Sequence, residues 1–258
     1  MPLHSKGRAR AAPTGRALLA LPSARTRRLL RTTFTCTGRF AIVERVWHEG
    51  TQPMKFYHWP GSSSIGIHIL LNELNLDFDA HIVALRTGAQ QEPEFQAISD
   101  KGKVPALVRE DGSTLTEFQA IAFWLAEAHP EGNLVPKDLE GKTRALELMD
   151  YIVGTVHMRG VTFILMPQKF LSDPEGQETL RAHGREIVTD GFQRLSRILG
   201  DKPYLLGDFS IADAGLFYLC HFAGRAEITM PDNINAFYAR MKARPAVAKT
   251  LEAEGWEA

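Results

Sequence analysis

A proline at the entrance of a short strand is the feature that most constrains how this chain folds. Residues 101–125 predict a β-hairpin, with strands at 104–108 and 113–115, followed by an amphipathic helix. Pro105 has no backbone N–H to give to a sheet, so it belongs at a strand start, an edge or a bulge. The Val104–Pro105 bond can also adopt the cis form at small cost. We therefore expect the backbone groups of Val104 to be unpaired and available to an extended peptide.

The elements before this hairpin predict a small mixed sheet. Strand-like and helix-like patterns alternate from residue 54, with turn residues between them. The order is β-α-β-α-β-β-α over roughly 75 residues, which implies one sheet with helices packed on it. The patterns that precede the hairpin are a strand at 55–59, a helix that starts among Ser62–Ser64, a strand at 78–85 and a helix at 92–98.

The rest of the chain predicts helices only. Residues 141–166 read as one long helix with a bend at Gly160, and residues 174–199 read as a second. Ser210 followed by Asp213 is the capping-box pattern in its Asp form, so a helix that begins there is expected at the centre of a second core. Helices at 233–243 and 246–254 complete the chain. The predicted organisation is an extension at 1–53, an α/β domain at 54–129, a linker at 130–139 and an all-α domain at 140–258.

Composition excludes several classes of protein. Two cysteines far apart, Cys36 and Cys220, predict neither a disulfide framework nor a metal site, and no apolar run approaches the ~18 residues that a membrane helix needs. Residues 1–53 carry ten basic and two acidic residues, which leaves 20 basic and 28 acidic residues, a net charge of −8, in 54–258. An acidic body argues against a nucleic-acid or anionic-membrane surface.

The basic segment at 1–53 differs from everything after it. It is rich in arginine, alanine, serine and threonine, has no acid before Glu44, and is expected to be disordered. An over-long start with Met54 as the working initiator, a mitochondrial or plastid targeting segment, and a basic arm all fit this composition. The expected location is the cytoplasm, or the mitochondrion if the segment is a true targeting signal.

The chain carries five short motifs in a fixed order: Tyr57–Ser64, Lys103–Leu107, Leu115–Glu117, Ser210–Asp213 and Arg244-Pro245. Together they resemble the cytosolic glutathione S-transferase family, with the bacterial beta class nearest. The resemblance covers residues 54–258 and implies a thioredoxin-like domain that binds glutathione, with a mixed four-stranded sheet, followed by an all-helical domain. It also implies a homodimer that uses glutathione as co-substrate, without a metal.

The chemistry of such a protein requires a thiolate. A free thiol has a pKa of about 8.5, and unpaired amides at a helix start together with a hydroxyl donor lower it by favouring the charged form. The resemblance carries a catalytic serine onto Ser62, which we favour, and the cysteine of beta-class relatives onto Ser63. Because that cysteine is absent, no mixed disulfide with glutathione can form there. The alternative is that these serines only cap the helix.

The resemblance also assigns the glutathione-binding residues. Val104, before Pro105, would pair with the cysteinyl backbone of glutathione, and Lys103 could reach its glycyl carboxylate. Glu117 lies at the helix start that reads the γ-glutamyl end. Relatives commonly carry Ser or Gly at the next position, whereas this chain has Phe118, which loses a side-chain hydrogen bond but keeps its backbone N–H.

Two histidines are candidates for the second-substrate pocket. His58 stands where beta-class relatives often carry tyrosine, and His157 matches a helix histidine of that pocket, although a lone helix histidine is more often structural. The predicted reaction is attack of the glutathione thiolate on a small apolar electrophile. The same thiolate could drive dehalogenation, isomerisation or ether cleavage, and a non-catalytic binding or stress-response protein of this fold is the alternative outside enzymes.

Overall fold

The computed structural model describes residues 29–30, 45–46 and 52–256. The chain forms two units, Met1–Thr51 and Gln52–Ala258. In the first unit the described residues are two short antiparallel strands, β1 (Leu29–Leu30) and β2 (Arg45–Val46). The predictions made for 1–53 otherwise lie outside the described residues. Within the described part of the chain, no helix has the length and apolar character needed to cross a bilayer.

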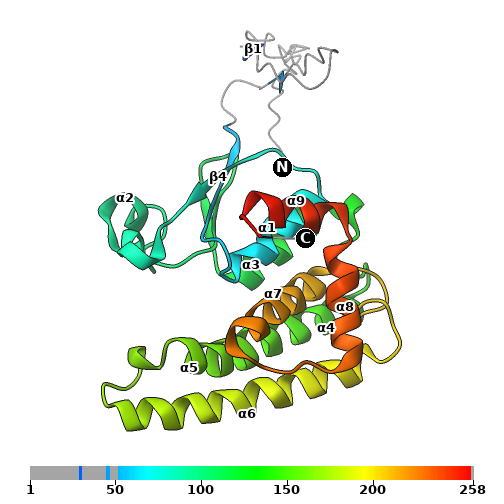
Figure 1. The fold of residues 1–258 in the computed structure, drawn as a ribbon. Coiled ribbons are helices and arrows are strands. Elements are labelled where there is room, and N and C mark those ends of the chain that lie inside the picture. The colour runs from blue at the N-terminus through cyan, green and yellow to red at the C-terminus, as the bar shows by residue number, and fades with distance from the viewer. Residues whose placement is uncertain (1–28, 31–44, 47–51, 257–258) are drawn as a thin grey trace, which may run out of the picture. The chain divides into compact units, whose positions relative to one another are not determined.

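A four-stranded mixed sheet forms the first half of the second unit (Figure 1). Its order is β4-β3-β5-β6, with β3 parallel to β4 and antiparallel to β5, and β5 antiparallel to β6. This arrangement confirms the predicted thioredoxin-like sheet. The strands are β3 (Met54–His58), β4 (Phe78–Ile82), β5 (Ala106–Val108) and β6 (Thr114–Thr116).

The helices of this half complete the predicted β-α-β-α-β-β-α order. Helices α1 and α3 pack together on the side of the sheet that faces the helical half, while α2 lies on the outer side (Figure 1). Almost every side chain of α1 is buried, because the helix lies between the sheet and the helical half. The helices are α1 (Ser64–Glu73), α2 (Pro93–Gln96) and α3 (Phe118–Ala128), and short 3-10 turns occur at Leu85–Thr87, Ala89–Gln91 and Pro130–Gly132.

Three local predictions in this half need correction. The strand expected at 78–85 ends at Ile82, and it lies at the sheet edge with Ile82 61% exposed rather than half-buried. The strand expected from 104 begins at Ala106, because Pro105 follows a cis peptide bond and cannot donate to a ladder. The expected helix at 92–98 is one turn long. In each case the type of element was predicted correctly and its length was overestimated.

The second half is helical, as predicted, and is built around α7 (Ile211–Ala226). The fully buried side chains of α7 include Phe217 and Tyr218, and α7 contacts α1, α4 and α8. The other helical segments are α4 (Leu139–Asp150), α5 (Thr162–Leu165), α6 (Pro174–Leu199), α8 (Asp232–Lys242), α9 (Pro245–Ala253) and a 3-10 turn at Pro167–Lys169.

The helix expected at 141–166 departs from prediction at its middle. Between α4 and α5 the chain runs as a π-helix, Tyr151–Val161, rather than as a bent α-helix. Gly160 allows the π-helix to pack closely against α6 and does not produce a bend, because a Cβ at this position would lie 2.6 Å from the Val188 side chain. A π-helical stretch is rare and often occurs at functional sites.

The last helix returns to the first half of the unit. Helix α9 packs against α1 (Figure 1), where Asn72 donates a hydrogen bond of 2.8 Å to Thr250. Arg244, just before α9, holds both carboxylate oxygens of Glu73 at 2.7 and 2.9 Å. This bidentate pair is the strong form of an ion pair. The two halves of the unit are therefore joined by the first and the last helix.

Candidate functional site

The turn that leads from β3 into α1, residues 59–64, is called the serine turn below. Its direction is set by Gly61, which has a positive φ of 70° and whose missing Cβ would lie 2.7 Å from the ring of Trp256. The Ser62 amide closes the turn by donating to the Trp59 carbonyl at 3.0 Å. A glycine is needed here because the backbone conformation and the space both exclude a side chain.

The serines of this turn differ in their hydrogen bonds. Ser64 is buried, and its hydroxyl lies 3.2 Å from both the Trp59 amide and the Trp59 carbonyl. Ser62 Oγ accepts from the Ser64 amide at 3.2 Å and lies 2.6 Å from Ser64 Oγ. When the Ser64 hydroxyl donates its hydrogen bond to Ser62 Oγ, the Ser62 hydroxyl is free to donate outward. When the Ser64 hydroxyl donates to the Trp59 carbonyl, the Ser62 hydroxyl donates to Ser64 Oγ and has no hydrogen left for a ligand. The orientation of the Ser64 hydroxyl therefore decides whether the Ser62 hydroxyl can donate a hydrogen bond to a ligand.

Ser63 is the most available of the three. It caps α1 without using its side chain, and no hydrogen bond with another described residue reaches its hydroxyl or its amide. A free amide, a free hydroxyl and the positive end of a helix dipole therefore coincide at one residue. Such a group of donors favours an anion.

The sheet register brings the other predicted residues to the same place. Tyr57 is paired with Ala106, and Ala106 is paired with Thr116. The segments that follow β3 and β6 and the segment that precedes β5 therefore lie at the same end of the sheet, which is called the sheet edge below. Val104 lies at that edge, and neither its amide nor its carbonyl is hydrogen-bonded to a described residue. This agrees with the expectation that its backbone is open to an extended peptide.

Two lysines near this edge differ in their contacts. Lys103 is exposed, and no hydrogen bond or ion pair joins its side chain to another described residue. Lys101, which the sequence did not single out, lies 2.8 Å from Glu117 Oε1 and 2.9 Å from Thr116 Oγ1. The hairpin brings Lys101 and Glu117 together across 16 residues, so no local pattern could show this pair.

Phe118 is the first residue of α3, and its side chain is 5% exposed. It packs edge-on against Tyr218, with ring centroids 5.0 Å apart, and it fills the space left by Gly66, where a Cβ would lie 2.7 Å from the ring. The side chain thus points into the interior, away from the exposed carboxylate of Glu117. The backbone N–H of Phe118 remains at the helix start, where an amide has no intrahelical partner.

His157 lies in the π-helix and faces aromatic rings. Its ring centroid is 5.3 Å from that of Tyr218 and 5.2 Å from that of Phe222. Its Nδ1 is buried without a hydrogen-bond partner among the described residues, and this burial lowers the pKa of His157 to about 4. The imidazole is therefore neutral at physiological pH.

His58 is placed where it cannot line an open pocket. Its side chain is buried, stacks on Phe56, and has its Nδ1 3.3 Å from Glu254 Oε1. The expectation that His58 contacts a second substrate is therefore corrected. The side chain alternates with that of Tyr57 along β3 and so points to the face of the sheet that α1 and α9 cover.

Two side chains of the helical half are hydrogen-bonded to the backbone of the serine turn. Glu254 Oε2 accepts a hydrogen bond of 3.1 Å from the Gly61 amide, and Arg225 donates one of 2.8 Å to the Gly61 carbonyl. Both backbone groups of Gly61 are thus fixed by side chains more than 160 residues away. The sequence gave no signal for this support, because the two side chains come from α7 and from the end of α9.

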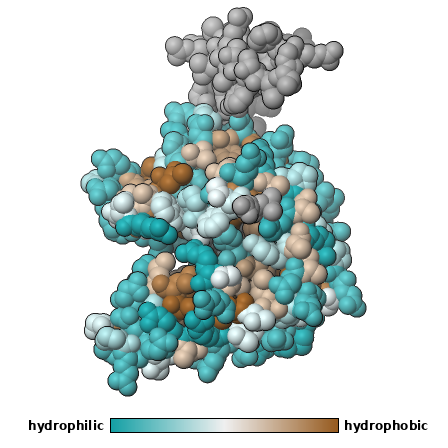
Figure 2. Space-filling view, viewed as in Figure 1, coloured by the Kyte–Doolittle hydropathy of each residue, from teal (hydrophilic) through white to brown (hydrophobic). Residues whose placement is uncertain are grey.

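An apolar surface lies near the π-helix. The side chains of Met158, Met166, Phe170 and Leu171 are exposed. Figure 2 shows apolar residues gathered on the helical half, below a hollow that separates it from the half that carries the sheet. Exposed apolar side chains beside a hollow are typical of a surface that binds small apolar molecules.

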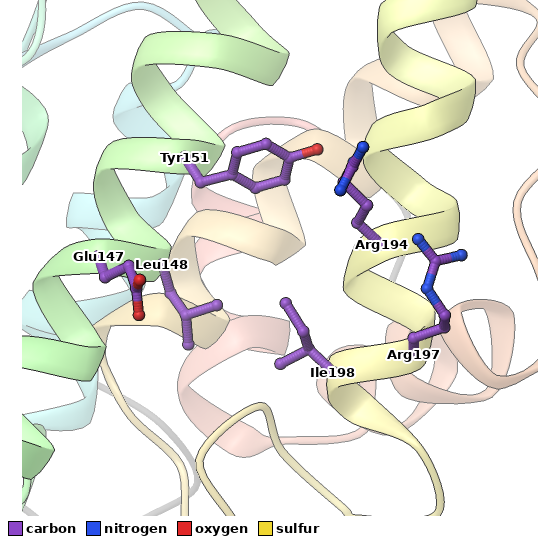
Figure 3. Close-up of a pocket in the computed structure, with 6 residues that line it drawn as sticks. All are labelled: Glu147, Leu148, Tyr151, Arg194, Arg197 and Ile198. Carbon is purple, nitrogen blue, oxygen red and sulfur yellow. The ribbon is translucent and has the colours of Figure 1, made fainter.

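A separate groove lies between α4, the π-helix and α6. It has a volume of about 470 Å³ and is lined by none of the predicted site residues. Figure 3 shows Tyr151 from one wall pointing across the groove toward Arg194 of α6, with Arg197 beside it. The groove is therefore distinct from the serine turn and carries no part of the argument for catalysis.

Comparison with known proteins places this geometry in a family. The family models described as the glutathione S-transferase N-terminal and C-terminal domains match residues 62–128 and 165–254. Glutathione S-transferase GstA of Escherichia coli O157:H7 is 32% identical over 207 residues, which cover 78% of this chain and 99% of that protein. The chain belongs to the glutathione S-transferase family.

Solved glutathione S-transferases have the same fold. A glutathione transferase homologue from Sulfitobacter with bound glutathione aligns with a TM-score of 0.73 and 29% identity, over 79% of this chain and 98% of that one. A beta-class glutathione S-transferase from Sphingomonas chungbukensis aligns with a TM-score of 0.68 and 30% identity, over 78% and 98%. The family and the fold inferred from the five motifs are thereby confirmed.

Proposed function

We propose that this protein activates the thiol of glutathione at the serine turn and transfers glutathione to a small apolar electrophile. Family membership supports the reaction class. The observation that carries the proposal is the convergence at one sheet edge of the serine turn, the unpaired backbone of Val104 and the start of α3. The proposed assembly is a homodimer, and the proposed location is the cytoplasm.

Thiol activation is assigned to Ser63, assisted by Ser62. A thiolate placed at the start of α1 would accept hydrogen bonds from the free amide and hydroxyl of Ser63 and would lie at the positive end of the helix. Ser62 can add a third donor only in the arrangement in which the Ser64 hydroxyl donates its hydrogen bond to Ser62 Oγ. This favours Ser63 over Ser62, in contrast with the preference drawn from the resemblance.

Glutathione would lie along the sheet edge as an added strand. The amide and carbonyl of Val104 would pair with its cysteinyl residue, which is β-augmentation on a strand start. Its γ-glutamyl end carries one carboxylate and one ammonium group. The free amides at the start of α3, including that of Phe118, suit the carboxylate, and the exposed Glu117 suits the ammonium.

The electrophile would bind over the exposed apolar side chains near the π-helix. Because His157 is neutral at physiological pH, it neither repels a cation nor neutralises the thiolate, and it can only donate or accept a hydrogen bond. An apolar electrophile is therefore a better match to this surface than an anionic one. Dehalogenation, isomerisation and ether cleavage use the same thiolate, and a panel of electrophiles with glutathione consumption as readout separates them.

Two serine variants test this proposal. Ser63→Ala keeps the backbone amide and removes the hydroxyl, so it is expected to lower kcat/KM with a generic aryl halide by roughly 10- to 100-fold, the cost of one charge-assisted hydrogen bond. It should also raise the pKa of bound glutathione, read from the pH dependence of kcat/KM and from thiolate absorbance. Ser62→Ala is expected to have a smaller effect. Ser113→Ala, in the exposed hairpin turn, is the matched control and should be unchanged.

The outcomes separate the candidate functions. If both serine variants keep turnover within about twofold, no serine of the turn activates the thiol and that assignment fails. If the wild-type protein is neither retained on immobilised glutathione nor stabilised by it, the protein is a binding module of this fold rather than an enzyme.

A further inference from the structure

Two histidines and a glutamate meet behind the serine turn. His58 belongs to β3, His68 to α1, and Glu254 ends α9, so the three residues come from distant parts of the chain. Their exposed fractions are 3%, 4% and 7%. His68 Nδ1 lies 3.0 Å from Glu254 Oε1, His58 Nδ1 lies 3.3 Å from the same oxygen, and the donor atoms all lie within 4.8 Å of one another.

We propose that His58, His68 and Glu254 form a binding site for a divalent transition-metal ion, with Zn²⁺ the best match. Two imidazole nitrogens and one carboxylate oxygen are a ligand set that zinc uses in proteins. Zinc binds such donors at about 2.0–2.2 Å, so a tetrahedral ion holds them roughly 3.3 Å apart. The separations of both nitrogens from the carboxylate oxygen agree with that spacing.

The hydrogen bonds of the cluster leave one donor atom unused. His68 Nδ1 is hydrogen-bonded to Glu254 Oε1, whereas His58 Nδ1 has no partner of acceptable geometry although it is buried. A buried ring nitrogen without a partner is costly, and a metal ion would satisfy it. The protein thus aims a free ligand atom at a carboxylate that is already positioned.

The surroundings match those of a metal site. The second carboxylate oxygen of Glu254 is held by the Gly61 amide at 3.1 Å, which fixes the orientation of the ligand. The ring of Phe56 lies 5.2 Å from that of His58 and 5.5 Å from that of His68, and the ring of Phe78 lies 5.6 Å from that of His68. Aromatic rings of this kind lower the local dielectric and strengthen the bonds of a bound cation, and a single water would supply the fourth ligand of a tetrahedral ion.

A bound ion would tie β3, α1 and α9 together at the residue that also holds Gly61. Its effect would therefore be on stability and on the order of the serine turn, and it would not contact the substrates. Because all donors are more than nine-tenths buried, the ion would enter as α9 docks during folding. The sequence predicted no metal site, because its two cysteines lie far apart and form no cluster. The proposed site instead uses two histidines ten residues apart and a glutamate 186 residues after the second of them.

Metal content after refolding tests the site. The full-length protein is unfolded in denaturant with a chelator, refolded with either Zn²⁺ or Co²⁺, and dialysed. About one ion per chain is expected by elemental analysis, with a tetrahedral Co²⁺ absorption spectrum and a higher Tm than the metal-free refolded protein. His58→Phe, which keeps the ring stack on Phe56, and Glu254→Gln are expected to lose the ion and the spectrum.

The control is a histidine–glutamate pair outside the cluster. His183 and Glu186 lie 3.5 Å apart on the exposed face of α6, so His183→Ala should bind the ion as the wild-type protein does. Wild-type protein that refolds with less than about one tenth of an ion per chain overturns the proposal. Equal binding by wild type and His58→Phe also overturns it, whatever the transferase activity of either protein.

Discussion

Two helices of this protein begin with serine, and they begin in opposite ways. At the start of α7, Asp213 accepts from the Ser210 amide and hydroxyl at 2.9 Å each and from the Leu205 amide at 2.9 Å. At the start of α1, the amide and hydroxyl of Ser63 have no partner among the described residues. The first helix start is closed by its own side chains, and the second is open.

The difference shows what each helix start is suited to. A closed start satisfies the orphan amides of the helix and stabilises the fold. An open start leaves those amides for a ligand and gives up that stability. The open start is held in place by other means, since Glu254 and Arg225 fix the backbone of Gly61 from the helical half. Stability at α1 is therefore supplied from a distance.

Removing the carboxylate of Asp213 is expected to give the largest effect. Asp213→Ala leaves three donors without their acceptor in a fully buried position, so the free energy of unfolding should fall by about 3–5 kcal/mol. Urea unfolding followed by circular dichroism measures it. The control is Asp232→Ala at the exposed start of α8, which should cost less than about 1 kcal/mol. Similar losses at both positions would mean that the buried hydrogen bonds of Asp213 contribute no more than an exposed carboxylate at a helix start.

The pH dependence of stability gives the next largest effect. His157 has a pKa of about 4 in the fold against 6.5 in the unfolded chain, so its contribution is present above pH 6.5 and is lost as the pH falls through about 4. Asp213 acts in the opposite sense, since burial raises its pKa to about 6 and its contribution is lost as the pH rises through that value.

A variant separates these two opposing terms. His157→Phe removes only the histidine contribution. Between pH 7 and pH 4 its free energy of unfolding should therefore fall by up to about 3 kcal/mol less than that of the wild-type protein. Unfolding in urea at several pH values measures the difference. His183→Ala, at an exposed histidine, should run parallel to the wild type. A pH-independent difference for His157→Phe would mean that its ring nitrogen is solvated.

The close approach of α1 and α7 gives a third test. A Cβ on Gly66 would lie 2.7 Å from the Phe118 ring and 2.9 Å from the Ala214 carbonyl of α7, so Gly66→Ala should cost about 2–3 kcal/mol. Adding Phe118→Leu should restore part of this loss, because only the ring clash is relieved. Gly224→Ala, where the added Cβ meets nothing within 4 Å, is the matched control and should be neutral or stabilising. Full recovery in the double variant would show that the backbone of α7 can move.

The smallest effect is expected at the sheet edge. Lys101→Met removes the exposed pair with Glu117, so the unfolding free energy should change by less than about 1 kcal/mol. The KM for glutathione should rise by roughly two- to fivefold, because the Glu117 carboxylate loses the partner that positions it. Lys142→Met breaks a pair of the same length, with Glu127, and should leave this KM unchanged. An equal KM in all three proteins would mean that Lys101 does not position Glu117 for glutathione.

Local patterns predicted most of the fold. Residues 174–199 form a helix with the predicted bounds, the 101–125 segment forms the hairpin and helix, and Ser210 begins the central helix as the capping pattern indicated. These elements depend on periodicity and on turn residues, which the sequence displays directly. The π-helix at 151–161 could not be predicted, because nothing distinguishes its residues from those of an ordinary helix until α6 packs against them.

The candidate site was predictable in part. The motifs led to Ser62, Ser63, Val104 and Glu117, but which serine keeps a free amide depends on the turn that Gly61 directs. Contacts between distant segments gave no signal at all. Lys101 beside Glu117, and the cluster at Glu254, exist only after the hairpin closes and α9 docks.

Because α9 packs on α1, the first helix can complete its contacts only at the end of synthesis on the ribosome. The hydrogen-bond partners of Asn72 and His68 lie 178 and 186 residues further along the chain and are synthesised later. At a synthesis rate of about 5–20 residues per second, that delay is roughly 10–40 s. During this interval the apolar face of α1 lacks its final cover, so a nascent chain of this protein is expected to depend on chaperones until its last helix emerges.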